Sequence, residues 1–279
     1  MSWFDFMVLG YVLGGIVRTR IRWAVLGVCL LLGLLCLPAQ AKPLVRLANG
    51  EWPPYLSETL PHFGFASDVV QKAFEAVGVE VEYEFFPWSR AFSYALQGRD
   101  EDGRVLHGTL VWVYTPARAV SFLYSDVVIE DSEVLFYSRD NPLDWSEMED
   151  LRGKIIGGAS GAAYLLLDDA EAAGILTIER SGGYESLFVR LLHGRVDAVP
   201  MVTQVGRFYV ERVLNEEERK LIAWHPKVIQ HRQYHLILSK NVDESKALMP
   251  LFNKGLAAIR KDGTYAGLLA DLYAGKYDR

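Results

Sequence analysis

The chain has 279 residues, of which 29 are lysine or arginine and 35 are aspartate or glutamate, giving a net charge of −6 at pH 7. An acidic chain with no basic run is a poor candidate for binding nucleic acid or anionic membranes, so we expect no nucleic-acid partner. Both cysteines, Cys29 and Cys36, lie in an apolar N-terminal stretch, so the rest of the chain has no thiol for disulfides, nucleophilic catalysis or thiolate metal sites.

The N-terminal stretch has the order of a secretory signal peptide. Three arginines precede the apolar run that starts at Trp23, and Ala-Gln-Ala closes it at Ala41. The run is shorter than the roughly 20 apolar residues of a membrane span. We therefore expect residues 1–41 to be a signal peptide and the protein to be periplasmic. The apolar segment 1–17 fits either a start codon assigned too far upstream or an uncleaved anchor. Leu35 before Cys36 disfavours lipidation.

Cleavage after Ala41 leaves 238 residues with a net charge of −8, which is long enough for two lobes of ordinary domain size. The first block of this part alternates β-rich runs with helical patterns, in the order β-α-β-α-β, which is typical of α/β architecture with parallel strands. We expect strands at 44–49, 79–86 and 108–114 and helices at 66–78 and 88–98.

A second block of the same kind begins after residue 140. We expect its strands at 154–159, 176–180 and 196–202 and its helices at 162–174, 184–194 and 203–214. The tail, 245–275, is predicted to be helical with a break near Asp262-Gly263. Extended passages at 127–138 and 228–239 flank the second block, so the chain crosses twice between two lobes, which makes a hinge.

Arg118 is the most informative single residue of the first block. It lies in VWVYTPARAVSFLYSD, 111–126, and no acidic residue is found within seven positions on either side of it. A guanidinium keeps its charge even when partly buried, so it needs an anionic partner or water. That partner is either a distant acid of the fold, such as Asp126 or Asp68, or a ligand outside the chain.

The surrounding motif resembles the T-P-E-R-A…F-S-x-P pattern of bacterial extracellular solute-binding proteins of family 3, the polar amino-acid type. Five further motifs of the chain resemble segments of that family in the same order along the sequence, and although each is weak alone, their order makes the signal strong. They are WPPY at 52–55, GFASDVV at 64–70, DLRGK at 150–154 with the glycines at 157 and 161, LLHGRVDAV at 191–199, and IRKDGTY at 259–265.

The resemblance implies a two-lobed α/β chain with the periplasmic binding protein type II fold, in which two sheets with parallel cores are joined by a hinge of two crossings. On this basis residues 42–137 form the first part of lobe one, 138–232 form lobe two, and 233–279 return to lobe one. The resemblance also implies that Arg118 binds the ligand carboxylate in a bidentate contact.

Other candidate ligand contacts follow strand ends, where open α/β sheets bind their ligands. Aromatic rings there can stack on a ligand or exclude water, and backbone N–H groups at a helix start can bind an anion. Rim packing or core packing is an equally good explanation for each ring taken singly. The candidates in lobe one are Trp52, Tyr55, Trp88, Arg90, Trp112 and Thr115, and those in lobe two are Gly161, Ala162, Tyr164, Thr203 and Gln204.

Two positions depart from the family pattern. Amino-acid binders of this family commonly have an acid for the ligand ammonium a few residues after D-A-V, and that position falls near Val202, which is apolar. Gly161 is followed by Ala162, where many members have serine or threonine. The sequence therefore predicts a ligand with a carboxylate more clearly than it predicts an α-amino acid.

The leading hypothesis is a monomeric, non-enzymatic receptor that captures a small molecule between its lobes and delivers it to an ABC-type permease. The alternatives are a sensing module for a membrane receptor and a lyase or dehydratase-like enzyme on the same fold. Against an enzyme, Ser160 does not complete a G-x-S-x-G motif. His231 and His235 lack a third metal ligand nearby, and no phosphate or dinucleotide fingerprint is present, so we expect no cofactor and no metal.

Overall fold

The computed structural model describes residues 42–160, 162 and 164–278, so the predicted signal peptide lies outside the described residues. The described helices include none that is both long and apolar enough to cross a membrane. The first block has the predicted β-α-β-α-β order. Its elements are β1 (Leu44–Asn49), α2 (Phe65–Glu75), β2 (Glu80–Phe85), α3 (Trp88–Gln97) and β3 (Gly108–Trp112).

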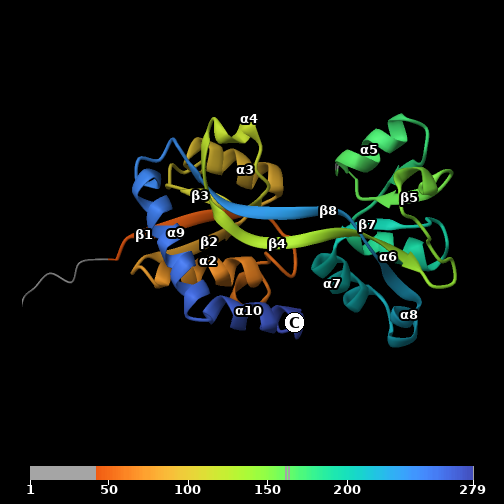
Figure 1. Ribbon diagram of the computed structural model, residues 1–279. Helices are drawn as coiled ribbons and strands as arrows, with labels where there is room; N and C mark the ends of the chain where they lie inside the picture. Colours follow the sequence, from red (N-terminus) through yellow and green to blue (C-terminus); the bar gives the residue numbers. More distant parts are fainter. Residues whose placement is uncertain (1–41, 161, 163, 279) are drawn as a thin grey trace, which may run out of the picture. The chain divides into compact units, whose positions relative to one another are not determined.

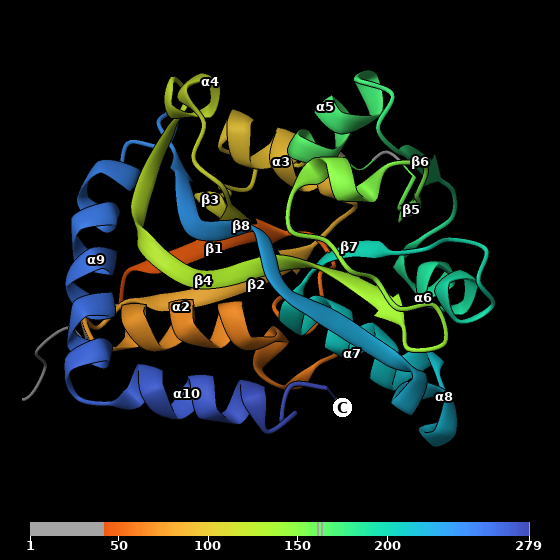
Figure 2. The same cartoon turned by 45° about the vertical axis from the view of Figure 1, so that its right-hand side comes forward.

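The strand β1 is central in this block, because it pairs in parallel with β2 on one side and with β3 on the other. Its side chains alternate between two apolar layers, as the pleat of a strand requires. Leu47 packs in the main core together with α2, whereas Ala48 faces Ala91 of α3. The helices α2 and α3 therefore cover opposite faces of the sheet (Figures 1 and 2).

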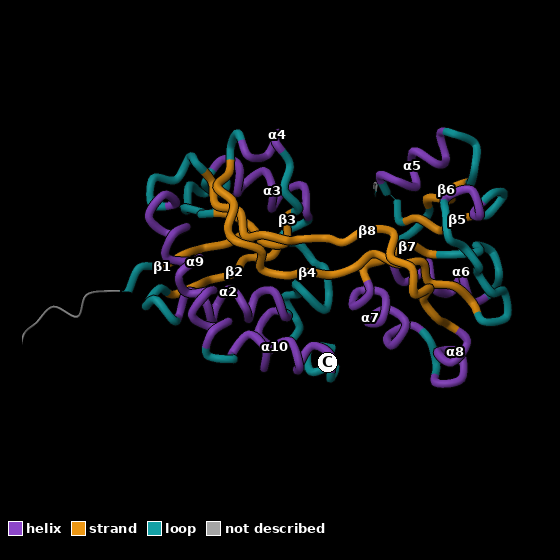
Figure 3. Tube along the Cα trace, viewed as in Figure 1, coloured by secondary structure: helices purple, strands orange, loops and turns teal. Residues whose placement is uncertain are grey.

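Two long strands cross from the first block to the second. They are β4 (Phe122–Ser138) and β8 (Ile222–Ser239), which pair in antiparallel fashion over most of their length. Figure 3 shows them as two extended strands that run side by side between the blocks. The sheet order β2-β1-β3-β8-β4-β7 makes this pair the continuation of the first sheet. The predicted extended passages are thus confirmed, but both strands begin earlier than predicted. Phe122 and Leu123 pair with the end of β8, and Ile222 and Ala223 pair with the end of β4.

The second block contains a parallel pair of strands, β5 and β6, and a third strand, β7, that hydrogen-bonds to β4. A single parallel bridge, Ile156 to Ala198, links β5 to the chain just before β7. The helix that corresponds to the predicted one at 162–174 spans Leu165–Ala172. The elements are β5 (Ile155–Gly158), α5 (Leu165–Ala172), β6 (Thr177–Arg180), α6 (Tyr184–Leu192), β7 (Val199–Val202) and α7 (Thr203–Val213).

The C-terminal part returns to the first block. Helix α9 (Ser245–Lys261) lies alongside α2 (Figure 1), and at their contact a Cβ on Gly255 would be 1.9 Å from the carbonyl oxygen of Ala73, so only glycine allows this approach. The predicted break at Asp262-Gly263 is confirmed, because Gly263 has a left-handed backbone and α10 (Thr264–Tyr273) starts after it.

Short elements are absent from the sequence prediction because they carry too few residues for a periodic pattern. They are α4 (Pro116–Ala119), α8 (Glu216–Leu221) and two 3-10 turns, η1 (Pro61–Phe63) and η2 (Met148–Leu151). Of these, α4 contains Arg118, the predicted carboxylate-binding residue.

Candidate functional site

Arg118 is positioned by the cap of α4. The Thr115 hydroxyl oxygen accepts a hydrogen bond from the backbone N–H of Arg118 at 3.2 Å, and Pro116 occupies the first helical position, where its missing N–H has no cost. The Thr-Pro sequence therefore determines where the short helix begins. Thr115, predicted as a ligand contact, serves in this structure as the residue that orients the arginine backbone.

The Arg118 guanidinium is half-buried against aromatic rings. Its central carbon lies 4.6 Å from the centre of the Trp112 ring and 6.0 Å from that of Phe92, and Nη1 donates to the carbonyl of Val113 at 3.2 Å. Within the described residues no carboxylate lies close enough to form an ion pair with Arg118. Of the two predicted acids of the fold, Asp68 accepts from the Tyr277 hydroxyl at 2.8 Å, whereas Asp126 contacts Asn253 through its backbone N–H. Several guanidinium N–H groups thus remain for an external anion.

Two of the predicted tryptophans form one surface with Arg118. The ring of Trp88 meets Trp112 edge-to-face with 5.7 Å between ring centres, and its indole N–H donates to the carbonyl of Glu51 at 3.1 Å. The ring lies directly on Gly50, where an added Cβ would be only 2.3 Å from a ring carbon. The ends of β1, β2 and β3 therefore contribute to a single aromatic wall.

Trp52 and Tyr55 form a second aromatic group at the crossing strands. The ring of Trp52 lies 5.1 Å from those of Tyr55 and Tyr234. Tyr55 is almost completely buried and its hydroxyl donates a short hydrogen bond to a carboxylate oxygen of Asp131. Burial and the charge of Asp131 raise the pKa of Tyr55 well above its usual value, so the phenol stays protonated and serves as a donor.

Asp131 connects three elements. Besides Tyr55, its carboxylate accepts from the backbone N–H of Ser132 at 2.6 Å and from that of Gln204, at the start of α7, at 3.4 Å. The side chain is half-buried, and this burial raises the pKa of its carboxyl group above the usual value, although the hydrogen bonds oppose the shift.

Glu133 lies two residues further along β4, on the same face of the strand. Unlike Asp131, it is paired: its Oε2 accepts from Arg232 Nη2 at 2.8 Å and from Gln230 Nε2 at 2.6 Å. Burial and the charge of Glu133 raise the pKa values of Tyr184 and Tyr234. This face of the crossing strands therefore carries two acids and one arginine.

The second block contributes the starts of its helices. The Thr203 hydroxyl donates to the carbonyl of Ser132 at 2.9 Å, and the Gln204 side chain accepts from Arg207 at 3.2 Å. Tyr164 is buried, its hydroxyl accepts from the backbone N–H of Ala159 at 2.9 Å, and burial raises its pKa to about 12. Ala162 is partly buried next to it, and Gly161 lies outside the described residues.

The structure thus divides the predicted residues into groups. Arg118, Thr115, Trp112 and Trp88 gather at the strand ends of the first block, and Trp52, Tyr55, Thr203 and Gln204 gather around the crossing strands. Arg90 is brought into neither group: it is exposed on α3, near Tyr94 one turn further along, and within the described part of the chain no contact joins it to the others.

Sequence reasoning did not find the polar residues of the crossing strands. Asp131, Glu133, Arg232 and Tyr234 come together because β4 and β8 pair in a register that places Asp131 opposite Arg232. The signal in the sequence was the D-x-E and R-x-Y spacing in strand-like passages, since residues two apart share a face. No sequence feature indicated which face is buried.

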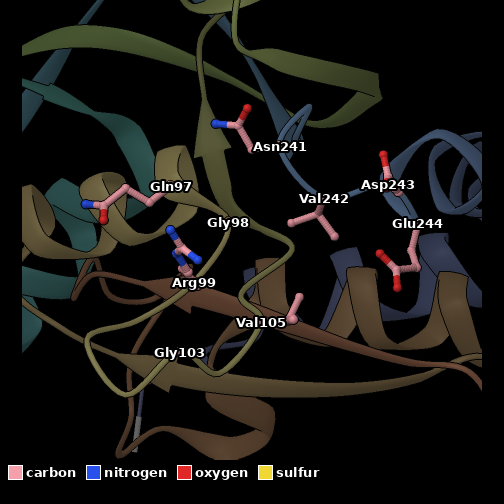
Figure 4. Close-up of a pocket in the computed structure, with 9 residues that line it drawn as sticks. All are labelled: Gln97, Gly98, Arg99, Gly103, Val105, Asn241, Val242, Asp243 and Glu244. Carbon is pink, nitrogen blue, oxygen red and sulfur yellow. The ribbon is translucent and has the colours of Figure 1, made fainter.

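Two further features lie apart from these groups. A hollow of about 650 Å³ is lined by the end of α3 and by the turn between β8 and α9, with Arg99, Asp243 and Glu244 at its wall (Figure 4), and none of the predicted site residues lines it. The described residues contain no cluster of three potential metal ligands, and His231 instead contacts the hydroxyl of Ser132 at 3.1 Å.

Aromatic side chains with a few charged groups, gathered at strand ends and on crossing strands, are typical of small-molecule binding sites. The model of the family described as bacterial extracellular solute-binding proteins, family 3, matches residues 45–274 of this chain. The chain belongs to that family.

Individual proteins are similar to this chain in sequence or in structure. The ABC transporter arginine-binding protein 1 of Escherichia coli (strain K12) is 28% identical over 152 residues, which cover 54% of this chain and 59% of that protein, so the matching part spans under two thirds of the relative. An ancestral arginine-binding protein bound to glutamine has a TM-score of 0.62 at 24% identity, covering 83% of this chain and 98% of that one. A histidine kinase sensor domain with similarity to periplasmic binding proteins has a TM-score of 0.61 at 21% identity, covering 82% and 95%. At such identities the two structures establish the type II fold alone.

Proposed function

We propose that this chain is a periplasmic receptor that binds an amino acid or a related small carboxylate through Arg118 and delivers it to an ABC importer. One observation carries the proposal: among the described residues Arg118 is a half-buried cation without a carboxylate partner, held by the Thr115 cap and by the ring of Trp112. A guanidinium so placed is pre-organised for a bidentate contact with a carboxylate.

Capture requires a second surface. We propose that lobe one comprises 42–137 and 233–279, that lobe two comprises 138–232, and that lobe two closes over a ligand bound to Arg118. The starts of α5 and α7 would then approach the aromatic wall of Trp88 and Trp112 and the second aromatic group at Trp52. A ligand drives such closure only as far as it binds the closed state better than the open one.

Delivery to an importer is proposed from the curated relative, whose name describes an ABC transporter arginine-binding protein. The same closure would also serve a membrane sensor. Co-purification from membranes with a permease supports transport, and co-purification with a receptor kinase in its place would replace transport by sensing.

A thermal-shift screen of the purified protein tests the binding function. The ligands are the twenty standard L-amino acids together with small carboxylic acids and amines. A ligand present at about a hundred times its dissociation constant stabilises the protein by about 2.7 kcal/mol, which raises the melting temperature by about 5–10 °C for a chain of this size.

Two variants make the screen specific. Arg118→Ala should abolish the shift produced by carboxylates, whereas Arg99→Ala, which removes an exposed arginine at the hollow of Figure 4, should leave it unchanged. Carboxylates that stabilise Arg118→Ala as much as the wild type would disprove the role of the arginine. Conversion of a ligand into product in the same samples would favour an enzyme.

A further inference from the structure

Asp131 differs from the other buried acids of the crossing strands in its partners. Its carboxylate accepts from the Tyr55 hydroxyl and from the N–H groups of Ser132 and Gln204, and the described residues provide no cation within ion-pair distance of it. A half-buried carboxylate without a cation is costly, because desolvation disfavours its charge. Among the described residues, hydrogen-bond donors therefore stabilise this carboxylate, but no cation pairs with it.

Glu133 does not have this property, although its position is the more obvious one. It pairs directly across the strands with Val202, the position where the family commonly has the acid that binds the ligand ammonium. Its carboxylate, however, is already neutralised by Arg232 at 2.8 Å and also accepts from Gln230. Of the two acids on this face of β4, Asp131 is the one that no described cation pairs with, so it is the one left to bind a cationic ligand group.

The surroundings of Asp131 suit an organic cation. The ring of Trp52 lies against both Tyr55, which holds the carboxylate, and Tyr234, whose pKa is affected by the charge of Asp131. Aromatic faces beside a carboxylate attract ammonium and guanidinium groups through their π systems.

The loop after β1 links this point to Arg118. Trp52 follows Glu51 in sequence, the carbonyl of Glu51 accepts from the indole N–H of Trp88, and Trp88 contacts Trp112, on which the guanidinium of Arg118 lies. Arg118 is therefore connected to the surroundings of Asp131 through Glu51, Trp88 and Trp112. A ligand that used both Arg118 and Asp131 would carry both charges.

We propose that Asp131 binds a cationic group of the ligand, ammonium or guanidinium, and so replaces the acid that is absent at Val202. The inference rests on the proposed function, because it assumes that Arg118 binds the carboxylate end. It narrows the ligand from a small acid to a zwitterion or a cationic amino acid.

The competing explanation is that Asp131 only stabilises the start of α7. In that case its loss would destabilise the protein and weaken every ligand alike. In a cation-binding role its loss should weaken only ligands that have the cation, without a loss of stability in the absence of ligand. Selectivity among matched ligands therefore distinguishes the two roles.

The test measures dissociation constants by calorimetry for the wild type and for Asp131→Asn, which keeps the side-chain shape and one acceptor oxygen. The probes are the twenty standard L-amino acids, together with four analogues. 5-Guanidinopentanoate lacks the ammonium of L-arginine, L-norvaline lacks its guanidinium, agmatine lacks its carboxylate, and 4-carbamoylbutanoate lacks the ammonium of L-glutamine.

We expect the wild type to prefer at least one amino acid over its counterpart without the cation. Asp131→Asn should lower the affinity for that amino acid by about thirtyfold or more, the usual result of removing one partner of a buried charge pair. Affinity for the counterpart should stay within about threefold. An analogue that binds equally well to the wild type and to Asp131→Asn lacks the cation that Asp131 binds, and so identifies it.

Two further variants control the measurement. Glu130→Gln removes the adjacent acid, which points to the opposite side of β4 and accepts from Gln233 at 2.8 Å, and it should bind like the wild type. Tyr55→Phe removes the hydroxyl that holds Asp131 and should reduce the preference for the cation only partly. Because this variant keeps the buried ring, it provides a second readout if Asp131→Asn does not fold.

The outcomes separate the two proposals. Asp131→Asn with unchanged amino-acid affinity, or a wild type that binds carboxylates equally well with and without the cation, overturns the role of Asp131. Binding of agmatine that depends on Asp131 but not on Arg118 supports Asp131 while overturning the carboxylate anchor. No binding of any zwitterion to the wild type overturns this inference.

Discussion

The contact between Gly50 and Trp88 offers a sharp test of how the aromatic wall is built. In the structure a Cβ on residue 50 would lie 2.3, 2.4 and 2.8 Å from three ring carbons of Trp88. Since carbon atoms in contact stay about 3.5–4.0 Å apart, Gly50→Ala must push the indole away by at least about 1 Å. The backbone φ of Gly50 is not in the left-handed region, so the clash alone produces the effect.

The displacement should have two consequences. The indole N–H loses its 3.1 Å hydrogen bond to Glu51, and the edge-to-face contact with Trp112 is disturbed. Overpacking of this kind costs about 1–3 kcal/mol, which lowers the melting temperature by about 2–12 °C. Because Trp88 is part of the proposed ligand surface, the affinity for the best ligand should fall by about two- to tenfold, the equivalent of one disturbed aromatic contact.

Differential scanning calorimetry and ligand titration measure both consequences, and a double-mutant cycle isolates the cause. In a Trp88→Ala background the clash has no partner, so Gly50→Ala should then cost less than about 0.5 kcal/mol. Gly267→Ala, in α10 with nothing within 4 Å of its added Cβ, should not destabilise the protein. A Gly50→Ala protein with wild-type stability and affinity would refute the packing described for Trp88.

Three other predictions concern the cap, the helix contact and the buried acid. Thr115→Val removes the acceptor for the N–H of Arg118 at the start of α4. It should lower the free energy of unfolding in urea by about 0.5–2 kcal/mol and weaken the binding of carboxylates. Unchanged binding would show that the cap does not position the arginine. Gly255→Ala places a Cβ 1.9 Å from the Ala73 carbonyl oxygen and should destabilise the protein by about 1–3 kcal/mol or more without changing relative ligand affinities, which thermal unfolding with and without ligand measures. Burial raises the pKa of Asp131 above its usual value, so its ionisation opposes folding at neutral pH, and stability is recovered as the pH falls through the raised folded pKa towards the usual one. The groups around it are Tyr55 and Tyr234, with Arg232 opposite and Glu133 beside it. The difference in free energy of unfolding between the wild type and Asp131→Asn should therefore shrink as the pH falls from 7 to 4. A difference that grows on acidification would contradict this sign.

Most of the fold was predictable because it depends on local patterns. The strand at 44–49 coincides with β1, and the break at Asp262-Gly263 separates α9 from α10, since apolar periodicity and a left-handed glycine act within a few residues. The early starts of β4 and β8 escaped prediction, because the first residues of each strand are held in it by pairing with the far end of the other strand, as Phe122 with Ser239 and Ile222 with Ser138.

The residues of the candidate ligand site could be predicted only where a sequence motif contains them. Arg118 was identified from its lack of nearby acids, and the structure provides it with the cap of Thr115 and the ring of Trp112 that the local sequence already contains. Arg90 follows a strand end in the same way, yet it lies on the exposed face of α3, since a helix directs successive side chains to different sides. Position along the chain alone did not distinguish the two arginines.

The sequence by itself determined the alternation of strands and helices, the break in the C-terminal helices and the cation at Arg118, because each depends on neighbouring residues. Only the tertiary structure decided that Glu133 is neutralised by Arg232 whereas Asp131 is not, and that Gly50 leaves room for the ring of Trp88. The physical reason is that burial and charge pairing depend on which distant segments meet. The register of β4 against β7 places Glu133 opposite the apolar Val202, the register of β4 against β8 places Asp131 opposite Arg232, and no local pattern encodes either register.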